Sequence, residues 1–158
     1  MENKDINIRF AQETESEVIL ELIRGLAAYE NMEDEVAATK EQIHETIFVN
    51  RDAEVLLAEY KEKIVGFALF FHTYSTFLGK TNIYLEDLFV KEEARGKGIG
   101  RLFFKHLAKI AIDKGYGRIE WCCLDWNQKS IEFYKHMGAE VLDDRRIYRI
   151  SDDKFKEV

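Results

Sequence analysis

The chain has 158 residues, of which 46% are hydrophobic and 34% charged, so we expect one folded domain over residues 1–158 with a packed core. Its 30 acidic residues outnumber 23 basic ones and give a net charge of −7, which argues against nucleic acid as a partner. No apolar run reaches the length of about 18 residues that a membrane span needs, so we expect no membrane partner. The adjacent Cys122 and Cys123 are unsuited to a mutual disulfide, which favours a cytoplasmic location.

Hydrophobic periodicity predicts one strand followed by two helices in the first third of the chain. Residues 6–11 alternate between apolar and polar side chains, which is typical of a half-buried strand. Apolar residues then recur at helical spacing over residues 14–26 and again over residues 39–48. We therefore expect a strand and two amphipathic helices before the main sheet.

The middle of the chain is rich in β-forming residues, and its last third alternates helices with strands. Three runs separated by short turns predict an antiparallel meander, at residues 53–60, 64–74 and 81–90. The elements that follow are a helix, a strand, a helix and a final hairpin, at residues 99–111, 118–125, 127–137 and 139–150. The expected order is β α α β β β α β α β β, which makes an α/β (α+β) domain of about seven strands and four helices.

The stretch RGKGIG combines glycine with positive charge immediately before a predicted helix. Its glycines let the backbone approach a ligand, and the start of the helix offers unpaired N–H groups to a phosphate. The spacing G-x-G-x-G differs from the dinucleotide fingerprint G-x-G-x-x-G, and the ending GK[ST] of a Walker loop is absent. Taken alone, the stretch is either a pyrophosphate site or a plain glycine turn.

Two motifs follow one another along the C-terminal half of the chain. The first, R-x-x-G-x-G/A, is formed by Arg95, Gly98 and Gly100. The second, N-x-x-S-x-x-F-Y-x-x-x-G-A, is formed by Asn127, Ser130, Phe133, Tyr134, Gly138 and Ala139. With these motifs the chain resembles the GNAT superfamily of acetyl-CoA-dependent N-acetyltransferases. The blocks LIRGLAAYENMEDEV, IVGFALFFHTYSTFLGK and IYLEDLFV are similar to those of the spermidine/spermine N-acetyltransferase group, which includes thialysine acetyltransferases.

The resemblance implies a GNAT fold, with a mixed and mostly antiparallel sheet, and acetyl-CoA as co-substrate. The glycine loop is implied to bind the pyrophosphate of coenzyme A through Arg95, Gly96, Lys97, Gly98, Ile99, Gly100 and Arg101. The preceding strand is implied to hold the acetyl carbonyl and the pantetheine arm through backbone groups of Leu88, Phe89 and Val90. Further contacts with the cofactor are implied for Asn127, Ser130, Tyr134 and Lys135.

An amine with a pKa near ~10.4 must lose a proton before it can attack a thioester at neutral pH. The resemblance implies that Glu86 accepts this proton through a water molecule and that Asp87 helps to bind a cationic acceptor. It also implies that Tyr134 is the general acid that protonates the departing thiolate. The residues alone allow plainer roles, because strand carboxylates are mostly solvated and a tyrosine on an amphipathic helix mostly belongs to the core.

The acceptor groove is implied to border the first helical region, near a dimer interface, and to include Tyr29 and Glu30. The acidic cluster around Glu30 is either a solvated helix end or part of an amine site. The chain departs from polyamine enzymes, because Phe77 and Arg145 stand where tryptophans are expected and neither Ser75 nor Leu78 is acidic. These departures favour a smaller cation, such as a lysine analogue or another diamine.

We therefore expect a homodimeric enzyme that transfers an acetyl group directly to a primary amine of a small cationic acceptor. Two alternatives stay open, namely acetylation of a protein lysine or N-terminal amine, and a coenzyme-A-binding regulatory module without turnover. The four histidines lie in different predicted elements and lack the spacing of metal ligands, so we expect no metal.

Overall fold

The computed structural model of the chain describes residues 5–158. It divides into two compact units, one that ends at Cys122 and one formed by Cys123–Val158. All the strands of the described residues lie in the first unit. The single domain expected from the length of the chain stays a prediction.

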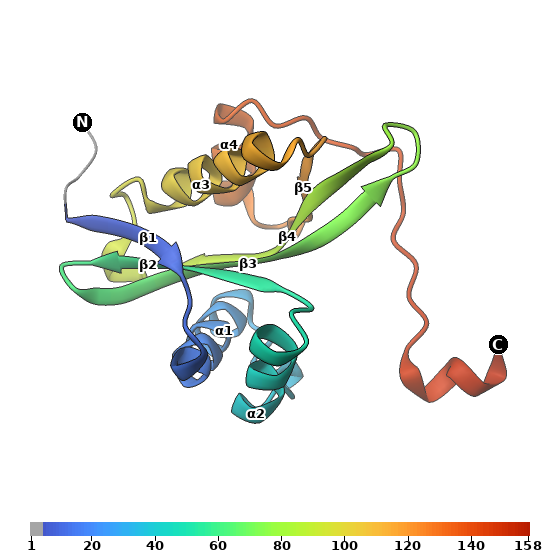
Figure 1. The fold of residues 1–158 in the computed structure, drawn as a ribbon, viewed down its shortest axis with the longest axis horizontal. Helices are drawn as coiled ribbons and strands as arrows, with labels where there is room; N and C mark the ends of the chain where they lie inside the picture. The colour runs from blue at the N-terminus through green and yellow to red at the C-terminus, as the bar shows by residue number, and fades with distance from the viewer. Residues whose placement is uncertain (1–4) are drawn as a thin grey trace. The chain divides into compact units, whose positions relative to one another are not determined.

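The first unit is built on one mixed sheet of five strands, which lie in the order of the sequence (Figure 1). The strands are β1 (Ile6–Phe10), β2 (Glu54–Tyr60), β3 (Lys63–Ser75), β4 (Lys80–Val90) and β5 (Ile119–Trp121). Each of the first four pairs antiparallel with its neighbour, whereas β5 runs parallel to β4. The expectation of a mixed and mostly antiparallel sheet is confirmed.

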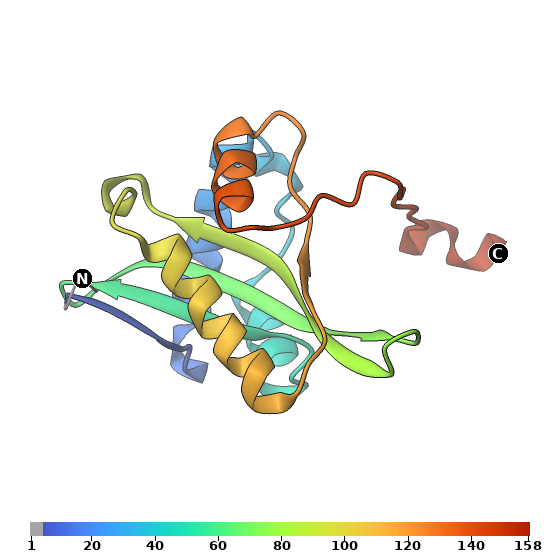
Figure 2. The ribbon, with the colours of Figure 1, turned by 90° about the horizontal axis from the view of Figure 1, so that it is seen from above.

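Helices cover both faces of this sheet. α1 (Ser16–Glu30) and α2 (Lys40–Ile43) lie against one face and α3 (Ile99–Lys114) against the other, as Figures 1 and 2 show. α2 continues directly into a π-helical turn, His44–Val49. The second unit contains α4 (Gln128–His136), so the four predicted helices are confirmed. Short 3-10 turns lie at Glu13–Glu15, Glu33–Glu35, Glu92–Ala94 and Asp152–Glu157.

Alternation along the central strands explains why both faces are covered. In β2, Val55 and Leu57 pack with buried residues of α1 and α2, while Leu56 and Ala58 pack with Phe103 and Leu107 of α3. These four strand side chains are at most 2% exposed. A strand with helices on both faces buries both sets of side chains, so its sequence is a continuous apolar run.

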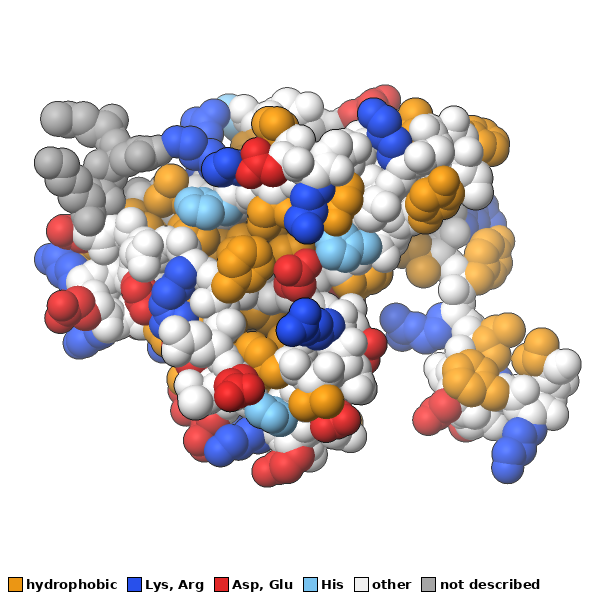
Figure 3. All heavy atoms as spheres, viewed as in Figure 1, with side chains coloured by type: hydrophobic (Ala, Val, Ile, Leu, Met, Phe, Trp, Pro, Cys, Tyr) orange, Lys and Arg blue, Asp and Glu red, His pale blue; other side chains and the backbone are white. Residues whose placement is uncertain are grey.

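The expected sheet of about seven strands is wrong, because residues 139–150 form no strand. The large apolar side chains of this segment are exposed, and Figure 3 shows apolar groups on the surface of the C-terminal end of the chain. Four consecutive charged residues, 143–146, interrupt the run. A two-stranded hairpin needs a third strand or a packed helix for stability, and alternation in the sequence does not supply that partner.

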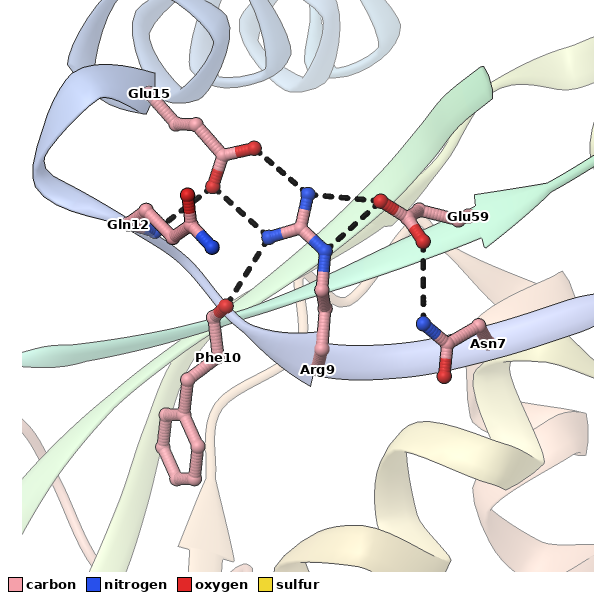
Figure 4. Close-up of polar contacts among 6 residues, drawn as sticks. All are labelled: Asn7, Arg9, Phe10, Gln12, Glu15 and Glu59. Carbon is pink, nitrogen blue, oxygen red and sulfur yellow. Dashed lines mark hydrogen bonds and ion pairs between the residues drawn. The ribbon is translucent and has the colours of Figure 1, made fainter. Parts of the chain in front are cut away.

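An ionic network ties β1 to β2 and to the turn that precedes α1 (Figure 4). The guanidinium of Arg9 donates to both carboxylate oxygens of Glu15, at 2.7 Å and 2.9 Å. Its Nε donates to Glu59 at 2.8 Å, and Asn7 donates to the other oxygen of Glu59 at 3.1 Å. The hydrogen bond from Arg9 lowers the pKa of Glu15, and those from Asn7 and Arg9 lower the pKa of Glu59. Glu15 and Glu59 therefore stabilise the folded protein when their carboxylates are charged.

We expect Arg9→Gln to lower the free energy of unfolding by about 1–3 kcal/mol at pH 7, because two half-buried carboxylates lose their charged partner. The stabilisation is present above the unfolded carboxyl pKa of ~4.3 and is lost as the pH falls through the lowered folded values. Urea unfolding at pH 7 and pH 3 measures this, and the difference from wild type should shrink at pH 3. The control is Lys109→Gln, which removes an exposed pair with Asp113 and should change stability by less than about 0.5 kcal/mol. Equal stability of Arg9→Gln and wild type at pH 7 would contradict the network's role.

Candidate active site

β4 has a strand on both sides only in its first half. Within the described part of the chain, β5 pairs with β4 at Ile83, Tyr84 and Leu85. β3 continues beside β4 as far as Val90, whose partner is Gly66. The part of β4 after Leu85 therefore has one edge along which no strand pairs with its backbone N–H and C=O groups.

Strand alternation identifies the backbone groups that face this open edge. Lys91 N–H donates to Val65 O on β3, at 2.8 Å. Since successive residues present their N–H and C=O groups to opposite edges, Leu88 and Val90 face away from β3. Val90 O accepts a hydrogen bond there from Arg95 Nε, at 2.8 Å. The N–H and C=O of Leu88 are thus directed to the edge where a ligand could replace a strand.

A β-bulge gives two neighbouring carboxylates of β4 different surroundings. Leu69 of β3 lies opposite Asp87 whereas Phe70 lies opposite Leu85, so Glu86 is the extra residue of the bulge. Glu86 is exposed and Asp87 is half-buried. The two carboxylates therefore differ in solvation although they are adjacent in sequence.

Burial and like charge raise the pKa of Asp87 to about 6. Burial is the largest cause, followed by the negative charges of Glu86 and Glu30. Glu30 is the last residue of α1, and burial raises its pKa as well. The following turn, Glu33–Glu35, is exposed. Of the acidic cluster around Glu30, the structure brings only Glu30 itself into a half-buried position that acts on Asp87.

The glycine stretch forms the turn that leads into α3. Gly96 and Gly98 have φ of +75° and +82°, a conformation that residues with side chains rarely adopt. The space that a Cβ would occupy at either glycine is open to 4 Å. Gly98 is the N-cap of α3, so the N–H groups of Ile99, Gly100 and Arg101 have no acceptor within the helix. This helix start, with its open backbone, has the geometry of an anion site.

The three basic side chains of this stretch differ in their surroundings. The guanidinium carbon of Arg95 lies 4.7 Å from the centroid of the Tyr29 ring. Lys97 Nζ lies 5.4 Å from the centroid of the Tyr60 ring. Arg101 is exposed on the first turn of α3. Arg95 and Lys97 therefore rest on aromatic rings of the protein, whereas Arg101 extends into solvent.

In the second unit, the predicted site residues lie along α4. Asn127 is the N-cap, and its Oδ1 accepts a hydrogen bond from Ser130 N–H at 3.2 Å. Tyr134 is half-buried, and its ring centroid lies 5.5 Å from that of Phe133. Lys135 is exposed. The cap at Asn127 fixes the first turn of the helix, and Tyr134 follows about two turns later.

Tyr84 is a polar neighbour of the carboxylates that the sequence analysis did not select. Its Oη lies 3.0 Å from Cys122 Sγ. This hydrogen bond, burial and the negative charges of Glu86 and Glu120 raise the pKa of Tyr84. The one signal in the sequence was its position two residues before Glu86.

No group of three or more potential metal ligands (His, Cys, Asp, Glu) comes together among residues 5–158. Over the same residues, no helix combines the length and the apolar character needed to cross a bilayer. Neither Cys122 nor Cys123 forms a disulfide.

The chain matches known proteins in both sequence and fold. The profile of the acetyltransferase (GNAT) family matches residues 19–139. Thialysine N-epsilon-acetyltransferase from Bos taurus is 40% identical over 146 residues, which cover 87% of this chain and 85% of the relative. L-ornithine N5-acetyltransferase from Arabidopsis thaliana is 42% identical over 95 residues, which cover 60% of this chain and 42% of the relative. The structure of an integron cassette protein from the mobile metagenome of V. cholerae covers 98% of both chains with a TM-score of 0.81 and 26% identity.

We expect Asp87→Asn to raise the free energy of unfolding by about 1–3 kcal/mol at pH 7, because it removes a half-buried charge that lies among like charges. The raised pKa of Asp87 means that the folded state binds its proton more tightly, so the carboxylate costs stability as the pH rises from ~3.9 to about 6. The gain from Asp87→Asn should therefore be absent near pH 3 and complete above pH 7. Urea unfolding across this range measures it, with the exposed Asp34→Asn as the matched control. If Asp87→Asn left the free energy of unfolding at pH 7 unchanged, or raised it no more than Asp34→Asn does, the Asp87 carboxylate would not destabilise the fold.

Proposed function

Because the chain belongs to the acetyltransferase (GNAT) family and is thus an N-acetyltransferase, we propose that it transfers an acetyl group from acetyl-CoA to the side-chain amine of a small cationic amino acid. The observation that carries the proposal is the group of carboxylates, Glu30, Glu86 and Asp87, beside the open edge of β4. Three acids at the end of one helix and on the bulge of one strand suit an acceptor with a positive charge.

The open edge of β4 and the glycine turn fit acetyl-CoA. Acetyl-CoA supplies the acetyl group as an activated thioester. The N–H groups of residues 96–101 hold the pyrophosphate, because the turn leaves its backbone open and the helix start favours negative charge. Backbone groups of Leu88 orient the acetyl carbonyl, and the N–H of Val90 on the same edge borders the pantetheine arm in place of a neighbouring strand. The contact that the resemblance implied for Phe89 stays a prediction, since its backbone groups face β3. The cofactor contacts that the resemblance implies for Asn127, Ser130, Tyr134 and Lys135 belong to the second unit and stay predictions.

Asp87 takes the proton that the acceptor ammonium must lose. A base whose pKa of about 6 lies near neutral pH is largely ionised at pH 7 and accepts a proton more readily than an ordinary carboxylate. Glu86 keeps that pKa high through its charge and helps to attract the cation. The roles that the resemblance implied for Glu86 and Asp87 are thus exchanged in this proposal.

Two protons leave the acceptor ammonium as it becomes an amide. One passes to Asp87 and from there to solvent. In the predicted role of Tyr134, its phenol protonates the departing thiolate, and the second amine proton then passes to the resulting phenolate. The products are the amide, coenzyme A as a thiol and one proton released to solvent. A phenol with a pKa of ~10 suits this transfer, because a thiol has a similar basicity, ~8.5 for cysteine.

Relatives support an amino acid as the acceptor more than a polyamine. The names of two of them specify side-chain nitrogens of amino acids, Nε of thialysine and N5 of L-ornithine. Both acceptors carry one terminal amine to be acetylated and an α-amino group that stays charged. In this proposal Glu30 meets the second of these charges, and Tyr29 precedes it on α1.

The protein acts as a homodimer in the cytoplasm in this proposal. Support for a second copy comes from the C-terminal segment, where Val141, Leu142, Ile147, Tyr148 and Ile150 are exposed. Exposed apolar side chains that follow one another in this way are typical of a surface that a partner covers. The cytoplasmic location rests on the sequence, where the adjacent Cys122 and Cys123 are unsuited to a mutual disulfide.

Release of free coenzyme A from acetyl-CoA tests the acceptor class. The panel consists of thialysine, ornithine, lysine, putrescine, spermidine and a lysine-containing peptide, with each amine also measured without enzyme. We expect kcat/KM to be at least about 10-fold higher for a small amino acid with a terminal amine than for the polyamines or the peptide, because binding energy in the acceptor site depends on charge placement. A higher value for the peptide would favour protein acetylation. Binding of acetyl-CoA without turnover of any amine would favour the regulatory module.

The pH dependence of kcat/KM distinguishes Asp87 from Glu86 as the proton acceptor. For wild type we expect kcat/KM to rise with pH through about 6, where Asp87 ionises. Asp87→Asn should remove this limb and lower the rate by about 100-fold at pH 7. Glu86→Gln should keep the limb but move it to lower pH, since it removes a like charge from Asp87. A limb that survives in Asp87→Asn and disappears in Glu86→Gln would return the role to Glu86.

A further inference from the structure

The backbone of Arg95 forms the start of the glycine turn, whereas its side chain points away from that turn. Its N–H donates to Glu92 O at 3.1 Å, which closes the turn before the glycines. The side chain is half-buried and runs back along β4, where Nε donates to Val90 O. A carbonyl at an open strand edge needs a donor, and this one is satisfied by the side chain rather than by a ligand or a strand.

The guanidinium of Arg95 also stacks against the last turn of α1. Its central carbon lies 4.7 Å from the ring centroid of Tyr29 and 5.8 Å from that of Phe89. Arginine stacks well on aromatic faces because its charge is delocalised over a plane and weakly hydrated. One side chain therefore contacts the end of β4 and the end of α1 at once.

Gly25 explains why Tyr29 can be reached at this point. A Cβ at Gly25 would lie 2.9 Å from Cε1 of the Phe89 ring, so α1 packs closely on Phe89 only because Gly25 has no side chain. Tyr29 lies four residues further on, on the same face of the helix. The contacts Gly25–Phe89 and Tyr29–Arg95 are thus consecutive along one side of α1.

Glu30, which follows Tyr29, is one of the three carboxylates proposed to bind the acceptor amine. Glu30 ends α1, and its carboxylate acts on Asp87. Any shift of the last turn of α1 moves Glu30 relative to the bulge in β4. The stacking of Arg95 on Tyr29 therefore links the backbone that begins the glycine turn to the carboxylates that meet the amine.

We propose that Arg95 is a positioning residue that fixes the acceptor side of the site, by holding Tyr29 and Val90 together, rather than a ligand of the phosphate. The inference rests on the proposed amine acetylation for its kinetic consequences. It departs from the role that the resemblance implied for Arg95. Arg95 thus positions the groups that bind the amine, whereas the backbone of residues 96–101 binds the pyrophosphate of the cofactor.

The test compares the variants Arg95→Gln, Arg95→Lys and Tyr29→Leu, with Arg118→Gln as the control, since Arg118 is exposed and lies outside the site. We expect the three variants to lower kcat/KM for the amine by about 10- to 100-fold, because a small misplacement of reacting groups has an effect of this size. The dissociation constant of acetyl-CoA, measured by calorimetry, should change less than about 3-fold. Arg95→Lys should not rescue, because an ammonium keeps the charge but loses the planar stack and the Nε donor.

The double variant Arg95→Gln/Tyr29→Leu gives a readout that separates coupling from two independent defects. If both residues act through one contact, the double variant loses no more than the worse single variant, whereas independent losses multiply. A dissociation constant of acetyl-CoA that rises 10-fold or more in Arg95→Gln, with restoration in Arg95→Lys, would overturn the inference and restore the phosphate role. Multiplying losses in the double variant would also overturn it.

Hydrogen exchange in the absence of substrates keeps this inference separate from the proposed function. Arg95→Gln should speed exchange of amides in the last turn of α1, residues 27–31, relative to Arg118→Gln. If wild type acetylates an amine and neither exchange nor amine kinetics responds to Arg95→Gln, the inference fails and the function stands. If wild type acetylates no amine, the function fails, and the exchange alone decides whether Arg95 holds α1.

Discussion

β4 loses its parallel partner at Leu85, and the rest of the site depends on that loss. Backbone N–H and C=O groups inside a protein need partners, and a strand that continues alone along one edge leaves them directed outward. Along this edge, the backbone groups of Val90 and Leu88 differ in their partners. Val90 O is satisfied from within the protein by Arg95, whereas Leu88 faces the same edge without a strand beside it. The extended arm of a cofactor can pair there as a strand would.

The bulge in β4 and the end of α1 bring three carboxylates together around the half-buried Asp87, whose negative charge destabilises the folded protein. Asp87 is adjacent to Glu86 and acted on by Glu30, and its raised pKa reflects the same free energy that destabilises the folded state at neutral pH. The network around Arg9 lies elsewhere in the same unit and works in the opposite sense, since it lowers the pKa of Glu15 and Glu59. Carboxylates that hold β1, β2 and α1 together are thus paired with a cation, and those that would meet a substrate are not. An unpaired acid can accept a cation or a proton, which a paired one does less readily.

Hydrophobic periodicity was sufficient to predict most of the helices and strands. It failed where a strand forms only if a neighbouring strand pairs with it. The apolar run of β2 and the helical stripe of α3 depend on local spacing, which the sequence contains. Residues 139–150 also alternate, but a strand needs a neighbour, and none of the described strands pairs with them. The bulge at Glu86 was invisible for a related reason, because it arises from the register between β3 and β4 rather than from either strand alone. The candidate residues were therefore found by motif, while the difference between Glu86 and Asp87 needed the structure.

Arg95 shows how a motif can identify a residue and leave its contact undetermined. A basic residue beside a glycine turn suggests a phosphate ligand, because charge and open backbone agree. The structure directs this side chain toward Val90, five residues earlier, and toward Tyr29, which is separated from it by about half the length of the first unit. The site has opposite electrostatic demands at its two ends, since a pyrophosphate is negative and an acceptor amine is positive. A cation placed between them, stacked on an aromatic ring and bonded to a backbone carbonyl, can separate the acidic end from the anion-binding helix start without a direct ion pair to either. The open edge of β4 then connects the two ends, and Arg95 lies where that edge ends.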